Sequence, residues 1–196
     1  MEQNNSNWQR DLALAERARA GSAVAFAEIV KAHQGLVWHM AWRMLQQRQE
    51  AEDCSQEVFL RVHQSLHQFR GESALATWIG RVAFSVALRM AQKRKLRIDL
   101  PGEQEPDAAF HAIGSGEDVQ RDHADAEQLR CLHEAIEQLP SLPRTVLGLH
   151  YRDGLAIAEI AHIMDCPEGT VKSHLNRGRA RLKAAFAPLE TTHVAL

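Results

Sequence analysis

The apolar residues are spaced as in helices along nearly the whole chain, and no strand-like alternation persists anywhere. Between residues 26 and 44 they recur every three or four positions, which predicts one long amphipathic helix. A second helix is expected to start near Glu50, and a third to run from about Ala74 into the nineties. The second helix carries one apolar stripe: Cys54, Val58, Val62 and Leu66. The fold class is therefore expected to be all-α.

A change of composition divides this helical pattern into two parts. Residues 98–125 contain three glycines, two prolines and eight acids against one arginine. Such a segment buries little and repels itself, so it is typical of a flexible acidic linker. We expect two small helical domains on either side of it, with short tails at the ends. The expected ranges are a polar tail at 1–21, a domain at 22–97, the linker at 98–125, a domain at 126–187 and a tail at 188–196.

The most specific local pattern lies between Ala156 and Leu182, where helix, tight turn and helix follow one another. Pro167 suits the first turn of the second helix, where its missing N–H costs nothing. At about 100° per residue, one face of that helix is apolar or small: Val171, Leu175, Gly178 and Leu182. The opposite face and its shoulders carry groups that can reach bases and phosphates: Lys172, Ser173, Asn176, Arg177 and Arg179. The alternative is an amphipathic helix with a solvated basic face.

Three segments of the first domain allow both a plain and a functional interpretation. The second helix exposes Glu52, Asp53, Gln56 and Glu57, which form either a solvated helix start or a docking surface for a partner. Phe69–Ser73 form a loop in which Gly71 permits unusual backbone dihedrals. The third helix becomes basic towards its end, which is either an ordinary helix terminus or a surface for a DNA backbone. Its basic residues are Arg89, Lys93, Arg94, Lys95 and Arg97.

Several classes of protein are disfavoured by composition. The net charge is -2, so nucleic acid would have to be bound by local basic patches. No apolar run is long enough to cross a bilayer, and the first eleven residues lack a signal-peptide core, so we expect a cytoplasmic protein without membrane insertion. The three cysteines are far apart, which indicates free thiols. No H-E-x-x-H, P-loop or nucleophile elbow occurs. His63 and His67 could share a zinc ion, but further ligands are not placed. We expect no enzyme activity, cofactor or metal.

Three segments together resemble one known family. Ala51–Val62 (AEDCSQEVFLRV) and Phe69–Val82 (FRGESALATWIGRV) look like parts of sigma domain two, and PEGTVKSHLNRGRARL resembles the recognition helix of sigma domain four. Their order and spacing are similar to those of the extracytoplasmic-function sigma factors in the sigma-70 family. The resemblance implies two helical sigma domains without the middle one.

The resemblance also implies partners and residue roles. Core RNA polymerase would bind Glu52, Asp53, Gln56, Glu57 and Phe59. Promoter DNA would be read at the minus-ten element by Phe69, Arg70, Gly71, Glu72 and Ser73, with Arg89, Lys93 and Arg94 on nearby phosphates. The minus-thirty-five element would be read by Lys172, Ser173, His174, Asn176, Arg177 and Arg179. A third partner would be an anti-sigma factor, often membrane-anchored in this family, and the free protein is expected to be a monomer.

One alternative is a stand-alone transcription regulator, because the TVKSHL segment also occurs in regulators with a similar helix-turn-helix. Such regulators usually carry a receiver or ligand-binding domain with strands, and the first half of this chain has no strand pattern. A regulator would bind its operator without polymerase, whereas a sigma factor would bind promoter DNA weakly alone.

Overall fold

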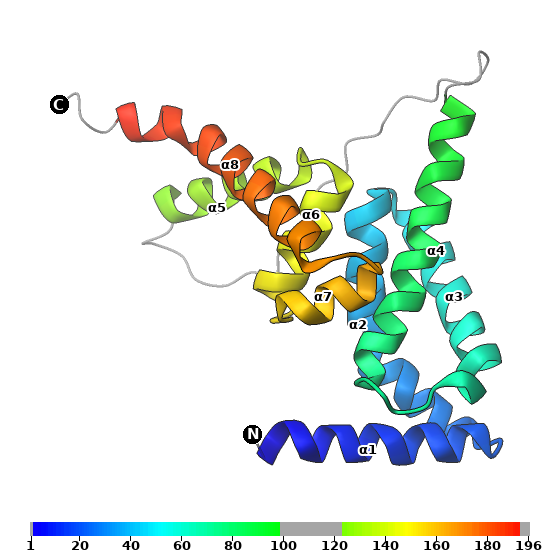
Figure 1. Ribbon diagram of the computed structural model, residues 1–196. Helices are drawn as coiled ribbons and strands as arrows, with labels where there is room; N and C mark the ends of the chain where they lie inside the picture. The colour runs from blue at the N-terminus through cyan, green and yellow to red at the C-terminus, as the bar shows by residue number, and fades with distance from the viewer. Residues whose placement is uncertain (1, 99–122, 193–196) are drawn as a thin grey trace.

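The computed structural model describes the backbone of residues 2–98 and 123–192, and the side chains of residues 9–96 and 129–185. Every regular element in these ranges is helical, which confirms the all-α prediction for them. The helices form two units that lie side by side (Figure 1). Most of the predicted linker, residues 99–122, lies outside the described residues.

The N-terminal unit is a helical bundle with a short 3-10 turn. Its elements are α1 (Glu2–Arg19), α2 (Ala23–Leu45), α3 (Arg48–Ser65), η1 (Leu66–Gln68) and α4 (Leu75–Ile98). Helices α2, α3 and α4 pack against one another, and α1 crosses one end of α2 (Figure 1). The core is mainly apolar: Ile29, Met40, Val58, Ile79 and Val86 are all fully buried. This bundle holds α3 and α4 in fixed orientations.

The second and third predicted helices, expected to start near Glu50 and Ala74, start at Arg48 and Leu75. The apolar stripe of α3 is buried as predicted, with Cys54, Val58, Val62 and Leu66 all in the core. Residues 1–21, expected to be a polar tail, contain helix α1 instead. Among its described side chains, Leu14 and Ala15 are buried against the bundle, and Leu12 and Ala18 pack beside them. Ser22 then caps α2, because its hydroxyl accepts a hydrogen bond from the Ala25 N–H at 3.2 Å.

The C-terminal unit is built of shorter helices. Its elements are α5 (His123–Glu137), α6 (Ser141–Leu147), the π-helical turn η2 (Gly148–Arg152), α7 (Ile157–Met164) and α8 (Glu168–Thr192). Helix α7 ends at Asp165, whose φ of 52° is left-handed, and Pro167 precedes α8. Helices α6, α7 and α8 pack together. The tight turn between α7 and α8 agrees with the predicted helix-turn-helix.

One histidine lies within the core of the N-terminal unit. His33 on α2 is 8% exposed, and its Nε2 has no hydrogen-bond partner among the described residues. Burial lowers the pKa of His33, and the nearby Asp11 opposes this only in part. The fold therefore favours the neutral imidazole.

We predict that His33 makes the protein less stable in acid. Below the ordinary histidine pKa of about 6.5 the unfolded chain takes up this proton before the folded chain does, so stability falls with pH. Urea unfolding of the full chain at about pH 7.5 and about pH 5.5 should show a smaller loss for His33→Leu than for wild type. Equal losses in the two proteins would contradict the prediction.

Candidate nucleic-acid interface

Helix α8 is held against its own unit by the face predicted from its periodicity. Val171 and Leu175 are buried, Leu182 is half-buried, and Gly178 lies directly over α6. A Cβ atom at Gly178 would lie 2.6 Å from Cδ1 of Leu147, closer than real contacts allow. Glycine therefore lets α8 approach α6, and the opposite face of α8 is turned to solvent.

The solvent face of α8 presents several side-chain hydrogen-bond donors. Asn176 and Arg177 are exposed, and Lys172 is exposed with its ammonium 3.4 Å from Glu168. Arg177 Nη2 donates a hydrogen bond to Ser173 Oγ at 2.9 Å. Ser173 thus holds the guanidinium of Arg177 along the helix, and the remaining N–H groups are available for a base or phosphate.

His174 and Arg179 lie differently from the other predicted residues of α8. His174 is half-buried, its Nδ1 has no partner among the described residues, and burial together with Arg177 lowers its pKa. Arg179 points to η2, where its Nε donates to the Tyr151 hydroxyl at 2.7 Å and its guanidinium lies 5.5 Å from the ring centre. In this arrangement Arg179 is a link between helices. Tyr151 is 28 positions from Arg179 in the sequence, and the sequence pattern did not predict this contact.

The loop before α4 combines a buried anchor with exposed polar groups. Phe69 is 2% exposed and packs on Trp78, with ring centres 5.6 Å apart. Gly71 has a φ of 73°, the left-handed conformation that its sequence position suggested. Arg70 and Glu72 are exposed, and the loop borders a hollow of about 600 Å³ that also touches His162 of α7. Phe69 anchors the loop to the bundle, so the exposed Arg70 and Glu72 are the loop side chains that can contact a base.

The basic residues of α4 are not equivalent. Lys93 is exposed, and Arg89 is exposed with Glu57 3.7 Å away. Arg94 instead turns inwards, because its Nη1 donates to the Leu45 carbonyl at 2.7 Å and to Glu50 Oε2 at 3.2 Å. Arg94 therefore fastens α4 to the end of α2, which its sequence position did not indicate.

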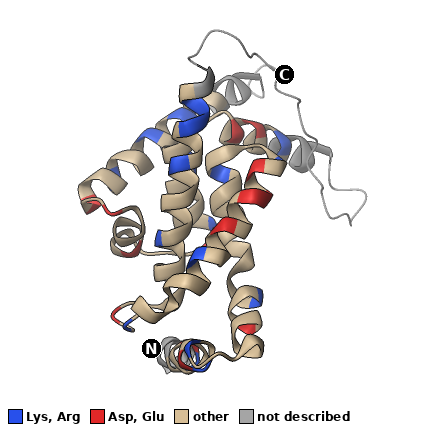
Figure 2. Cartoon of the chain, turned by 90° about the vertical axis from the view of Figure 1, so that its right-hand side faces the viewer, with Lys and Arg blue, Asp and Glu red and all other residues tan. Residues whose placement is uncertain are grey.

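Helix α3 carries an acidic surface on the outside of the bundle (Figure 2). Asp53 and Gln56 are exposed, while Glu52 and Glu57 form ion pairs one turn along the helix, with Arg48 at 2.9 Å and Arg61 at 2.6 Å. Phe59 borders an apolar hollow of about 570 Å³ between α2 and α3. The hollow is also lined by Val30 and Trp38, which sequence reasoning did not assign to this surface. Acids beside an apolar hollow suit a protein partner that offers cations and an apolar side chain.

The described residues give little support to a metal site, a reactive thiol at Cys54 or a membrane-spanning helix. No group of three histidine, cysteine, aspartate or glutamate side chains in those ranges is arranged to hold a metal ion. His63, one half of the weighed zinc pair, packs edge-on against Phe26 with ring centres 4.8 Å apart. Burial and the nearby Glu57 raise the pKa of Cys54 to about 11, so this thiol stays protonated. None of the described helices is long and apolar enough to cross a membrane.

Comparison with known proteins agrees with this arrangement. The family model for Sigma-70 region 2 matches residues 29–97, and that for Sigma-70, region 4 matches residues 129–182. The chain is 34% identical to the RNA polymerase sigma-H factor of Pseudomonas aeruginosa, over 92% of this chain and 96% of that relative. It is 33% identical to the ECF RNA polymerase sigma-E factor of Haemophilus influenzae, over 91% of this chain and 96% of that relative.

Solved structures show the same fold. The sigma factor RpoE, crystallised with the anti-sigma factor NepR from Bartonella quintana, matches with a TM-score of 0.65 and 21% identity, over 82% of this chain and 96% of that chain. CnrH in complex with the cytosolic domain of CnrY matches with a TM-score of 0.62 and 18% identity, over 89% of this chain and 96% of that chain.

Two sigma-70 regions in one helical chain define the class as a small sigma factor. With relatives of this identity along nearly its whole length, the chain belongs to the extracytoplasmic-function (ECF) RNA polymerase sigma factors.

We predict that the close approach of α8 to α6 depends on Gly178. Gly178→Ala should destabilise the protein by about 1–3 kcal/mol, because the buried Leu147 must move to admit a methyl group. Gly169→Ala is the matched control on the same helix, where a Cβ meets nothing within 4 Å. It should be neutral or stabilise by up to about 1 kcal/mol. Urea unfolding measures both variants, and equal effects would refute the packing argument.

Proposed function

We propose that this protein binds core RNA polymerase and directs it to specific promoters for the initiation of transcription. The observation that carries the proposal is the presence of sigma regions 2 and 4 in one chain whose sequence follows that of ECF sigma factors nearly end to end. A stand-alone regulator is disfavoured, because the first half of the chain is a sigma region 2 and not a receiver or ligand-binding domain.

Core polymerase would dock on α3. Asp53 and Gln56 offer exposed polar groups there, and Phe59 borders the neighbouring apolar hollow. Family resemblance suggests the clamp helices of the largest polymerase subunit as the partner. Exposed charges would steer the encounter, and the apolar hollow would add buried area.

Promoter DNA would be read at two places. The exposed face of α8, with Asn176 and Arg177, would enter the major groove of the minus-thirty-five element. The loop Phe69–Ser73 would take a base of the minus-ten element out of the stack, with Arg89 and Lys93 on nearby phosphates. Arg94 and Arg179 have protein partners in the described arrangement, so they would have to exchange these before touching DNA.

The protein would act without catalysis of its own, since RNA synthesis belongs to polymerase, and it would work in the cytoplasm. It would need no cofactor. Two structurally similar proteins were solved in complex with partners: the sigma factor RpoE with the anti-sigma factor NepR, and CnrH with the cytosolic domain of CnrY. We extend this to the present chain: an anti-sigma factor would hold it inactive until a stress or envelope signal arrives.

The direct test is run-off transcription with purified core polymerase on a genomic promoter library, with and without the protein. Discrete new start sites are expected. If no transcripts appear but the protein alone shifts specific DNA, the regulator function replaces this proposal.

The acidic surface of α3 gives a prediction within that assay. Asp53→Arg should weaken capture of core polymerase by about tenfold or more, because it reverses an exposed charge in the docking surface. Gln64→Arg places an arginine at an exposed site near the other end of α3, a change of one charge instead of two, and should bind normally. Pull-down of core polymerase compares the two, and equal binding would remove α3 from the docking surface.

A second prediction concerns the recognition helix. Arg177→Ala should cost about 1–3 kcal/mol of promoter recognition if its guanidinium forks a base. Lys31→Ala, which removes a cation from an exposed site on α2, is the control for non-specific charge. Transcription from a panel of promoter variants measures both, and an unchanged sequence preference in Arg177→Ala would refute the assignment.

A further inference from the structure

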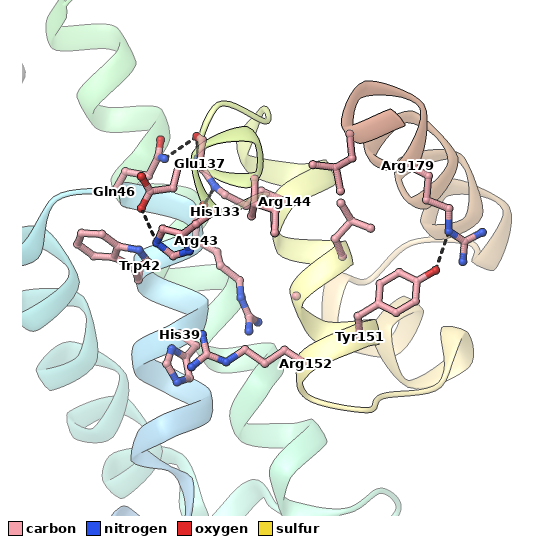
Figure 3. A pocket seen from close by; sticks show the side chains of 14 residues that line it. His39, Trp42, Arg43, Gln46, His133, Glu137, Arg144, Tyr151, Arg152 and Arg179 are labelled. Carbon is pink, nitrogen blue, oxygen red and sulfur yellow. Dashed lines mark hydrogen bonds and ion pairs between the residues drawn. The ribbon is translucent and has the colours of Figure 1, made fainter. Parts of the chain in front are cut away.

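A cavity of about 510 Å³ lies where α2 meets α5, α6, η2 and α8 (Figure 3). This volume is typical of sites that hold small organic molecules. Of the residues assigned above to polymerase or promoter contacts, only Arg179 lines the cavity. The function proposed above therefore leaves the cavity unexplained.

Part of the cavity wall is apolar. Trp42 of α2, Ile136 of α5 and Leu182 of α8 line it, and each is half-buried, so each keeps apolar surface that a ligand can cover. Trp42 also stacks on Trp38, with ring centres 6.3 Å apart, which holds its ring in place. Covering this wall is favourable because it removes apolar surface from water. This part of the cavity suits an aromatic or aliphatic body.

The rest of the lining carries an excess of positive charge. Its charged residues are Arg43, Arg144, Arg152, Arg179 and Glu137. Within the part of the chain that the structure describes, only one of these arginines forms an ion pair, Arg43 with Asp153 at 2.6 Å. The carboxylate of Glu137 lies 3.3 Å from His133 Nε2. Since cations outnumber acids around the cavity, its interior favours an anion.

Arg144 is a buried cation without an ion-pair partner among the described residues. It is 5% exposed, and its hydrogen bonds go to neutral carbonyl groups, that of Arg43 at 2.8 Å and that of Glu137. Its Nη2 donates to no described residue. Burial lowers the pKa of Arg144 to about 10, and Glu137 opposes this, so the guanidinium is charged at neutral pH. Buried charges are normally paired, and an anion in the cavity would supply the partner.

Arg152 provides a second cation on another side of the cavity. Its side chain is exposed and points towards His39 of α2 (Figure 3), and it forms neither a hydrogen bond nor an ion pair with the described residues. Burial, together with the charges of Arg152 and Arg43, lowers the pKa of His39. A neutral imidazole there can donate one N–H to a ligand. Donors on α2 and η2 therefore face the same space as the apolar wall.

We propose that this cavity is a binding site for a small organic anion with an apolar body. The body lies against Trp42, Ile136 and Leu182. The head, a carboxylate, sulfonate or phosphate group, balances the charges of Arg144 and Arg152. An inorganic anion would leave the apolar wall uncovered, and an uncharged molecule would leave Arg144 without a partner, so the lining favours a ligand that combines both parts.

The charge requirement is tested with two fluorescent probes. Anilinonaphthalene sulfonate is an aromatic anion of suitable size, and phenylnaphthylamine has the same rings without the sulfonate group. Titrated into the full chain near neutral pH, the sulfonate should bind at one saturable site, about tenfold or more tighter than the uncharged amine. Equal affinities, or no saturable binding of the sulfonate, would overturn the proposal.

The position of the probe is tested by NMR of the tryptophan indole N–H groups. The sulfonate should shift the Trp42 signal, which Trp42→Phe identifies by removing it. Trp78, which packs on Phe69 away from the cavity, should keep its shift. A shift of Trp38 alone would place the probe in the hollow between α2 and α3, and the proposal would then be wrong.

Variants of the lining separate the two parts of the site. Arg152→Ala should weaken binding of the sulfonate by about fivefold or more and leave the amine unchanged, because only the anion meets that charge. Lys31→Ala removes an exposed cation of α2 that does not line the cavity, and it should bind both probes as wild type does. Ile136→Trp places a larger ring in the cavity and should weaken both probes.

Circular dichroism and the urea midpoint show whether each variant folds. If Ile136→Trp fails to fold, Arg152→Ala still decides, because Arg152 is an exposed residue without a protein partner among the described residues. Unchanged binding of the sulfonate to Arg152→Ala would contradict the site. These measurements need neither polymerase nor DNA, so their outcome is independent of the proposed function.

Discussion

The C-terminal end of α2 is the point on which both halves of the molecule depend. The last turn of a helix leaves carbonyl groups without partners and concentrates negative charge there. Two of these carbonyls receive arginines: Leu45 from Arg94 of the same unit, and Arg43 from Arg144 of the other unit. Burial lowers the pKa of Arg144 to about 10, which still leaves it protonated at neutral pH. One helix end therefore closes the N-terminal bundle and docks the C-terminal unit.

The surfaces that face partners are organised by contacts beneath or beside them. Gly178 brings α8 down onto Leu147, which fixes how far the recognition face projects. Ser173 then holds the guanidinium of Arg177 along that face. In the other unit, Phe69 anchors the loop Phe69–Ser73 on Trp78 while Arg70 stays exposed. Side chains ordered in advance lose less entropy on binding, so these supports would favour affinity for whatever ligand these surfaces bind.

Periodicity predicted the helix starts and packed faces, which depend on the local spacing of apolar residues. It missed the contacts between residues that are far apart in the sequence. The starts of α3 and α4 and the packed face of α8 follow from apolar residues three and four apart, and the structure confirms them. The contacts of Arg94 and Arg179 join residues 49 and 28 positions apart, and the Arg43–Asp153 pair spans 110. An arginine on a helix surface has the same sequence signature whether it faces solvent, DNA or a carboxylate of another unit. Helix α1 was missed because most of residues 1–21 are polar or charged, which the sequence analysis interpreted as a tail.

The π-helical turn η2 contacts both helix α2 of the N-terminal unit and helix α8 of its own unit. The N–H of Asp153 donates to the carbonyl of Gly148 at 3.0 Å, five residues back, which returns Asp153 to the neighbourhood of Gly148. Arg43 lies over Gly148 and so meets the carboxylate that the wide turn has brought there. The same turn carries Tyr151, which holds Arg179 of α8. One short turn therefore carries both the carboxylate that meets Arg43 of α2 and the tyrosine that meets Arg179 of α8.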